Sequence, residues 1–173
     1  PFRATTNQQQ GQNDFIILRF AEAYMLRAEA YGRKGDFSSA VNDFNVLRER
    51  AAYKDGEEKP QEFWLVEGGV QGDLTSTYEE IKLSVDDIQT GFDGTGDFLD
   101  FVLDEMSREF NGENRRWLDL ARFDRLYERI MKYNPDAAVN ILPHHRLRPI
   151  PSQHIERLIP IPDNSEIQNP GYY

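Results

Sequence analysis

The stretch from Asp97 to Phe123, DFLDFVLDEMSREFNGENRRWLDLARF, predicts two helices joined by a tight corner. Asp97 is placed to cap the first helix, and Asp100 adds the negative charge that the helix dipole favours in a first turn. Gly112 follows where a left-handed residue can end that helix. The apolar side chains of this first helix recur at helical spacing and form one stripe: Phe98, Phe101, Val102, Met106 and Phe110.

The second helix is expected to run from Glu113 to about Tyr133, because Pro135 cannot continue it. Its inward side chains are predicted to be Trp117, Leu120, Ala121 and Phe123. Trp117→Ala should then remove a core residue, at a cost of about 3–5 kcal/mol. Around the corner, opposite charges lie within reach of one another: Arg108, Arg115 and Arg116 against Glu105, Glu109, Glu113 and Asp119.

Another helix pair is predicted over residues 14–52. Asp14 is expected to cap a helix that ends near Lys34, and after Gly35 a second helix starts at the cap Asp36. The two buried stripes are Ile17, Ala21, Tyr24, Ala28 and Tyr31, and Phe37, Val41, Phe44, Leu47 and Ala51. With its small and aromatic residues at these positions, the pair resembles one tetratricopeptide repeat, a helical hairpin of about 34 residues.

The remaining segments have little helical periodicity. Residues 1–13 are polar and are interpreted as a flexible lead, and residues 53–96 form a long irregular insertion. Within that insertion, Ser76 and Glu79 predict a capping box for a short helix through Leu83. Residues 134–173 are rich in proline, which predicts an extended tail that wraps the surface. The fold class is therefore all-α, in a single domain over residues 1–173.

Composition excludes several classes of function. The 173 residues carry a formal net charge of −10, which argues against nucleic-acid binding, since phosphate needs a clustered basic surface. The absence of cysteine excludes disulfides and thiolate metal sites. No apolar run approaches the roughly 20 residues that cross a bilayer, so no transmembrane segment is predicted in this chain.

Catalytic and metal-binding patterns are weak. Glu105 and Glu109 could form a glycosidase pair, but the neighbouring arginines favour a structural ion-pair network. His144, His145 and His154 have no companion ligand set, and residues 92–97, FDGTGD, are better explained as a turn before a capped helix than as a calcium loop. We therefore expect no hydrolytic activity, no metal and no cofactor.

The signature also carries a resemblance to a known family. Eleven of its residues fall into the pattern of the SusD/RagB family: Glu105, Arg108, Glu109, Phe110, Gly112, Glu113, Arg116, Trp117, Asp119, Leu120 and Arg122. Met106 departs from it, since the family often has Arg there. The tail resembles the family's end as well, in a Pro-Ile-Pro segment (residues 160–162 rather than 149–151) and in QNPGY over residues 168–172.

This resemblance implies a non-catalytic, surface-exposed outer-membrane lipoprotein that binds glycans or other nutrient oligomers for a SusC-like TonB-dependent transporter. It also implies that this chain is a C-terminal half, preceded by a lipid-anchored N-terminal region. The alternative is a helical-repeat adaptor that binds only protein, which should show further repeats and no long aromatic insertion.

The ligand-binding residues are predicted in the insertion at residues 53–96, because the other aromatics lie on periodic, inward stripes. Aromatic rings pack against the C–H faces of sugars, and polar neighbours bond the hydroxyl groups. Trp64 is the strongest candidate, with Phe63 and Tyr78 as companions. The competing interpretation is that Trp64 packs the insertion onto the helices.

Overall fold

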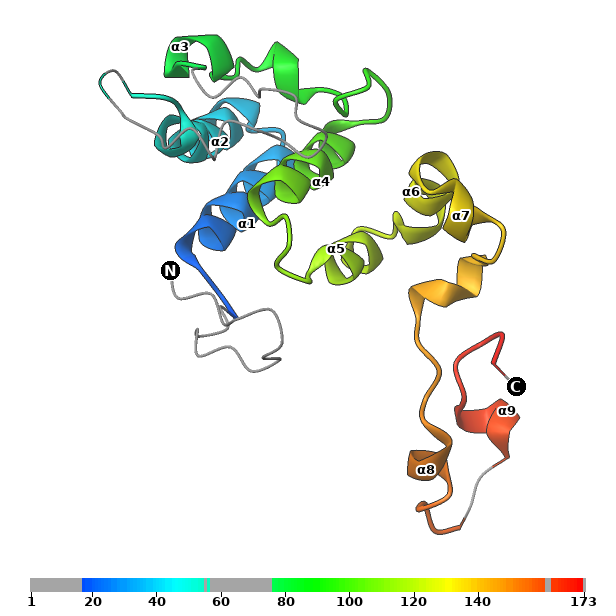
Figure 1. The fold of residues 1–173 in the computed structure, drawn as a ribbon. Helices are drawn as coiled ribbons and strands as arrows, with labels where there is room; N and C mark the ends of the chain where they lie inside the picture. Colours follow the sequence, from blue (N-terminus) through cyan, green and yellow to red (C-terminus); the bar gives the residue numbers. More distant parts are fainter. Residues whose placement is uncertain (1–16, 55, 57–75, 161–162, 173) are drawn as a thin grey trace, which may run out of the picture. The chain divides into compact units, whose positions relative to one another are not determined.

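The computed structural model describes residues 17–54, 56, 76–160 and 163–172, and the chain groups into two compact units, Pro1–Glu109 and Phe110–Tyr173. Within the described residues the chain is helical, and β pairing is limited to an isolated bridge between Tyr53 and Thr77 (Figure 1). The all-α prediction is thus confirmed. No helix in these ranges is long and apolar enough to cross a bilayer.

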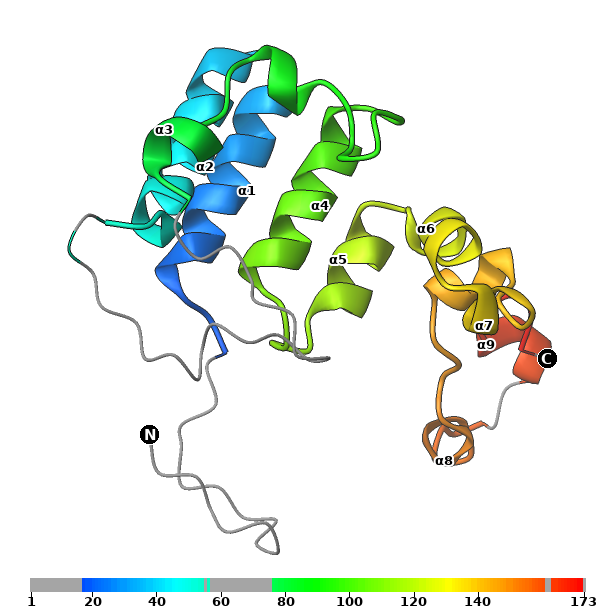
Figure 2. The ribbon, with the colours of Figure 1, turned by 45° about the horizontal axis from the view of Figure 1, so that its top comes forward.

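Unit 1 starts with a helical hairpin, α1 (Phe20–Arg33) and α2 (Phe37–Ala51), which Figure 2 shows side by side. As predicted, the Asp36 carboxylate caps α2 and accepts from the Ser39 backbone N–H at 3.1 Å. The start of α1 was predicted too early. Arg19 is still extended, with its guanidinium bonded to Glu109, and Ile17 is exposed instead of starting the buried stripe.

Small residues let the helices of unit 1 approach closely. Ala28 and Ala40 are fully buried where α1 meets α2, as the hairpin pattern predicted. On the other side of α1, a Cβ on Gly32 would lie 2.1 Å from the Phe98 ring, so only glycine admits α4 here. The exposed Ala51 departs from the predicted stripe because α2 ends there. That this hairpin is a tetratricopeptide repeat stays a prediction.

The helix α4 (Phe98–Glu109) agrees with its sequence pattern. The Asp97 carboxylate accepts from the Leu99 and Asp100 backbone N–H groups, and the Asp100 carboxylate accepts from the Asp97 N–H. All five residues of the predicted stripe are buried. The rings of Phe98 and Phe101 pack on Phe44 of α2 with centroid distances of 6.4 and 5.4 Å. This aromatic contact forms the centre of the core of unit 1.

A buried ion pair joins α2 to α4. The Arg48 guanidinium donates to both oxygens of Glu105, at 2.7 and 2.8 Å, and its third nitrogen donates to the Ile81 carbonyl at 2.8 Å. The side chains are only 14% and 6% exposed. The predicted corner pairs are also present, with Arg108 3.9 Å from Glu105 and Arg115 3.2 Å from Asp119. Arg48, which makes the closest contacts with Glu105, was not among the predicted partners.

The segment between α2 and α4 contains α3 (Tyr78–Ile81) and the 3₁₀ turn η2 (Asp86–Ile88). The capping box lies one residue later than predicted, because Glu80 rather than Glu79 accepts from the capping backbone N–H, that of Thr77, at 2.7 Å. The helix ends at Ile81, before the predicted Leu83. Its end is fixed by Asn45, whose side chain holds the Leu83 backbone in an extended course.

In unit 2, the prediction of a single helix from Glu113 to Tyr133 is wrong. Two helices occur instead, α5 (Arg116–Arg122) and α6 (Leu126–Tyr133). Asp124 adopts the left-handed conformation (φ 55°), and the next backbone N–H, that of Arg125, bonds the Leu120 carbonyl, which closes α5. The break brings Leu126 into the core beside Leu120 and Phe123, all three of which are buried.

Trp117 is a second correction in unit 2. Its side chain is 39% exposed rather than buried, and the Arg148 guanidinium lies 5.4 Å from its ring. The buried face of α5 is set by Asp119, Leu120 and Phe123, and at 100° per residue Trp117 falls to one side of that face. A Trp117→Ala substitution is therefore no longer expected to act as a core truncation.

The proline-rich tail is not simply extended. It forms short helical turns: α7 (Pro135–Ala138), η3 (Pro143–Arg146), α8 (Ser152–Ile155) and α9 (Asn164–Ile167). Pro135 and Pro143 occupy the first positions of such turns, where a backbone N–H is not needed. The prolines therefore start turns here as well as interrupting helices.

The QNPGY motif pairs the end of the tail with residues 147–150. The Gln168 amide bonds both the N–H and the carbonyl of Ile150, and the Tyr172 hydroxyl donates to the Leu147 carbonyl at 2.9 Å. Gly171 has a positive φ of 92°, and a Cβ there would lie 2.4 Å from the His144 ring. Side-chain amides thus bond peptide groups next to prolines, which lack an N–H of their own.

We predict that Glu105→Ala will destabilise unit 1 by about 3–5 kcal/mol, because it leaves the buried Arg48 guanidinium without its carboxylate. Urea unfolding followed by circular dichroism measures this loss. The matched control is Glu79→Ala, which removes the exposed partner of Lys82 and should leave the unfolding midpoint unchanged. Equal midpoints for the two variants would contradict a structural role for the buried pair.

Candidate functional site

Of the three predicted ligand-binding residues, Trp64 and Phe63 lie outside the described residues. Tyr78 is the first residue of α3 and is half-buried. It lies two positions before Glu80, the first residue of the insertion that lines a hollow in unit 1. The roles of Trp64, Phe63 and Tyr78 in binding stay predictions.

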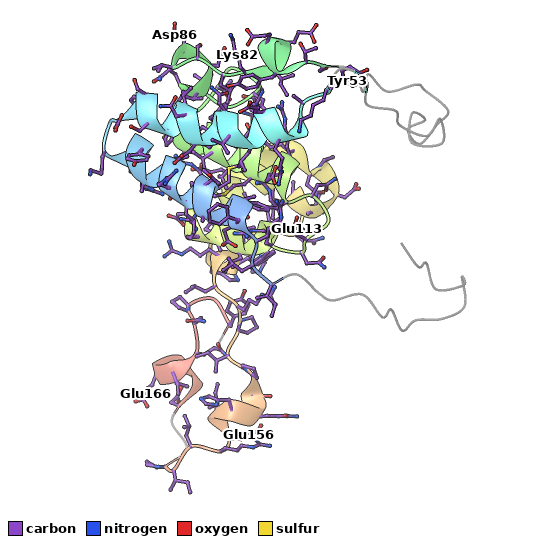
Figure 3. The ribbon with its side chains drawn as sticks, turned by 90° about the vertical axis from the view of Figure 1, so that its left-hand side faces the viewer. Tyr53, Lys82, Asp86, Glu113, Glu156 and Glu166 are labelled. Atoms are coloured by element: carbon purple, nitrogen blue, oxygen red, sulfur yellow. The ribbon has the colours of Figure 1, made fainter. Side chains whose placement is uncertain are left out.

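The hollow has a volume of about 580 Å³ and is built from three parts of unit 1. Arg48 comes from α2, Phe101 and Arg108 come from α4, and the rest of the lining belongs to residues 80–94. Figure 3 shows two of these lining residues, Lys82 and Asp86, along the segment that runs beside α2. The described part of the predicted insertion therefore contributes most of the surface of this hollow.

Polar contacts to α2 fix the wall of the hollow. The Asn45 side chain accepts from the Leu83 N–H at 2.8 Å and donates to the Leu83 carbonyl at 2.9 Å. Further along, the Asp87 carboxylate accepts from the N–H and the hydroxyl of Ser84, at 2.7 and 2.6 Å. These bonds lower the pKa of Asp87, so its carboxylate stays ionised. Behind the wall, Ile88 is fully buried.

A glycine-rich turn places Phe92 in the lining of the hollow. As predicted, residues 92–97 form a turn before a capped helix, and the Asp93 carboxylate accepts from the N–H and the hydroxyl of Thr95. The Phe92 backbone N–H donates to Asp104 at 3.0 Å, which ties the turn to α4. The Phe92 side chain is 42% exposed, and Phe101 packs edge-on against its ring.

Arg108 covers the Phe92 ring with its guanidinium group. The central carbon of that group lies 3.7 Å from the ring centroid, close enough for a strong cation–π contact. Partial burial lowers the pKa of Arg108, and repulsion from Arg48 adds to this effect against the opposing attraction of Glu105. The hollow thus presents a cation that is stacked on an aromatic ring and borders solvent.

The chemistry of this hollow suits the binding of a polar ligand. It combines hydrogen-bond donors, carboxylate acceptors and one exposed aromatic ring, which is the mixture that recognises polyhydroxylated ligands. The two carboxylates considered as a glycosidase pair are engaged by arginines, Glu105 by Arg48 and Glu109 by Arg19 and Arg50. No group of three or more potential metal ligands occurs among the described residues.

A smaller hollow of about 440 Å³ lies in unit 2. Tyr127, Pro143, Leu147 and Pro170 form its apolar part, and Arg146, which is 3.3 Å from Asp124, adds charge. Its apolar part joins α6 to the tail that QNPGY holds in place. The histidines nearby serve this packing, since the His144 ring contacts Tyr172 and the His145 Nδ1 accepts from the Leu142 N–H.

The described residues thus combine a helical fold with a polar hollow that offers hydrogen-bond donors and acceptors. The SusD family model matches residues 3–173, nearly the whole sequence, so the chain belongs to the SusD family, as its signature indicated. Members of this family are surface lipoproteins of the outer membrane that bind glycans or other nutrients, and they are not enzymes. No curated protein and no solved structure matched the chain in the corresponding comparisons.

We predict that Asn45→Ala will loosen the wall of the hollow, because both hydrogen bonds from α2 to Leu83 are lost. Amide hydrogen exchange should become at least about tenfold faster around Leu83, in proportion to the free energy lost from local opening. The control is Asn42→Ala on the exposed face of α2. Unchanged protection in Asn45→Ala would show that other contacts hold the segment.

Proposed function

We propose that this chain captures a glycan or a similar nutrient oligomer at the hollow of unit 1. The observation that carries the proposal is the position of that hollow, which residues 80–94 of the irregular insertion build against α2 and α4. Irregular insertions on a rigid helical scaffold are where proteins commonly place their binding residues. Here the buried Arg48–Glu105 pair and the aromatic core supply the rigid scaffold.

The residues of the hollow suit sugar hydroxyl groups. Arginine and lysine nitrogens donate to hydroxyl oxygens, and carboxylates such as Asp86 accept from hydroxyl hydrogens. The exposed Phe92 ring supplies apolar surface for the C–H groups of a sugar ring. We propose that Trp64, Phe63 and Tyr78 add aromatic contacts to the same ligand, since they belong to the same insertion.

We propose further that the captured ligand passes to a SusC-like TonB-dependent transporter. Membership of the SusD family supports this partnership, because family members work with such transporters. The same membership supports a location on the outer surface of the outer membrane, held by a lipid attached N-terminal to this sequence.

The test of this function is binding by the intact protein. A glycan array identifies a ligand, and isothermal titration calorimetry then compares the parent with Trp64→Ala. Loss of one stacked aromatic ring should weaken binding by about 3- to 10-fold. The matched control is Trp117→Ala, which removes the tryptophan of unit 2 and should leave affinity unchanged. If Trp64→Ala binds like the parent, Trp64 does not contact the ligand, and an array without any bound glycan would contradict the function.

We also predict that the intact protein will not hydrolyse the glycans it binds, because arginines hold both candidate carboxylates in ion pairs. Product analysis of polysaccharide and chromogenic glycoside panels after prolonged incubation measures this. Turnover that disappears in Glu109→Gln would overturn the prediction.

A further inference from the structure

We propose that the hollow of unit 1 selects glycans that carry a carboxylate, as uronic acids do, and that Arg108 binds this carboxylate. The inference rests on the proposed function and adds the chemical class of the ligand. It follows from the unequal use of the two arginines that line the hollow.

Arg48 has its hydrogen-bonding capacity engaged inside the protein. It donates to both oxygens of Glu105 and to the Ile81 carbonyl, and its side chain is only 14% exposed. Glu105 is correspondingly occupied, because each of its oxygens already accepts from Arg48. Arg48 lines the hollow, but these bonds leave few of its donors for a ligand to bind.

Arg108 differs from Arg48 in its hydrogen bonding. Its closest carboxylate oxygen among the described residues belongs to Glu105, 3.9 Å from Nη1, which is too long for a hydrogen bond. Its side chain is 58% exposed and borders the hollow. The donors of this guanidinium are therefore available to a ligand.

The surroundings of Arg108 favour an anionic partner. Two guanidinium groups, those of Arg48 and Arg108, lie near the carboxylate of Glu105, which Arg48 already engages, and Asp104 adds a further attraction to Arg108. Burial and the nearby Arg48 lower the pKa of Arg108, which shows that both oppose its charge. A carboxylate in the hollow would oppose both effects by attracting the charge of Arg108.

Stacking on Phe92 gives this cation a fixed position. With its central carbon 3.7 Å from the ring centroid, the guanidinium has one side covered, which limits how it can turn. A planar fork of N–H donors held in this way matches the two oxygens of a carboxylate better than a flexible ammonium would. The contact of Arg48 with Glu105 shows the same bidentate pattern within the protein.

The acidic residues of the lining narrow the choice among anions. Asp87 is engaged by Ser84 and Glu80 by Thr77, and Asp86 lines the hollow as a further exposed carboxylate. These groups repel a densely charged polyanion or a free oxyanion, but they accept hydrogen bonds from sugar hydroxyl groups. A sugar whose single carboxylate lies among hydroxyl groups satisfies both sets of side chains.

The experiment uses the intact protein and matched ligand pairs. Oligosaccharides that each carry a single galacturonic, glucuronic, mannuronic or guluronic acid residue are compared by calorimetry with their carboxyl-reduced counterparts, which keep the sugar ring and lose the charge. Inorganic sulfate and a sulfated oligosaccharide complete the panel. We expect at least one uronate to bind about tenfold or more tighter than its reduced counterpart, as a charge-assisted hydrogen bond predicts.

Arg108→Gln should abolish this preference and leave the affinity for the reduced ligand within about twofold of the parent. Arg108→Lys, which keeps the charge and loses the planar fork, should restore only part of it. The control is Arg146→Gln, an arginine of equal exposure (58%) that lines the hollow of unit 2 and should keep the full preference. Melting curves establish that each variant is folded, and the ligand pairs test the parent protein independently of any variant.

The outcomes separate this inference from the proposed function. Binding of neutral glycans without any preference for uronates would overturn the inference and leave the function standing. A uronate preference that survives in Arg108→Gln would overturn the role of Arg108, and binding of only sulfate or sulfated sugars would overturn the choice of carboxylate. If no oligosaccharide of this panel binds, the inference fails, and the glycan array decides the proposed function separately.

Discussion

The bidentate contact between Arg48 and Glu105 is the interaction on which unit 1 depends. It connects α2 to α4 across 57 positions of sequence, and through the Ile81 carbonyl it also fixes the end of α3. Burial of such a pair is costly, and its attraction offsets that cost only when all donors and acceptors are matched. Here they are matched, so the pair determines how the two helices and the intervening segment align, whatever net stability it adds.

The same contact contributes to the polar character of the hollow, which lies next to the hydrophobic core of unit 1. A line of aromatic rings runs from Phe44 through Phe101 to Phe92, which carries the rigidity of the core outward to an exposed ring. Beside that ring, Arg48 holds both oxygens of Glu105, and Arg108, one turn further along α4, borders the hollow with its side chain 58% exposed. A structural ion pair inside the protein thus sets the electrostatics of the surface next to it.

Features that depend on residues close together in the sequence could be predicted. Contacts between residues far apart in the sequence could not. The caps at Asp36 and Asp97 and the stripe of α4 could be recognised because each depends on residues within one or two turns. The partner of Glu105 could not, since nothing near it in sequence indicates Arg48. The break after α5 was missed for another reason: Asp124 tolerates a positive φ without requiring it, so the helical pattern seemed continuous.

The candidate site divides in the same way. The sequence predicts ligand contacts in the insertion at residues 53–96, and residues 80–94 of it line the hollow. The predicted contact residues are aromatic, however, because an aromatic residue outside a periodic apolar stripe can be recognised in the sequence. The availability of Arg108 could be recognised only after its neighbours were known, since the family signature alone places it beside Glu105 without showing that Glu105 is already engaged.

The signature is continuous in sequence, but its two parts have different structural roles. Its first part, through Glu109, completes unit 1: Glu105 binds Arg48, and Glu109 accepts from Arg19 and Arg50 at the ends of α1 and α2. Its second part organises unit 2, where Arg115 pairs with the buried Asp119 and covers the Phe110 ring at 4.2 Å. Trp117 belongs to neither set of ion pairs, and it is 39% exposed although it is the largest aromatic residue of the motif. The motif is better described as two adjacent sets of ion-pair partners than as one helical corner, because the ion pairs of its first part lie in unit 1 and those of its second part lie in unit 2.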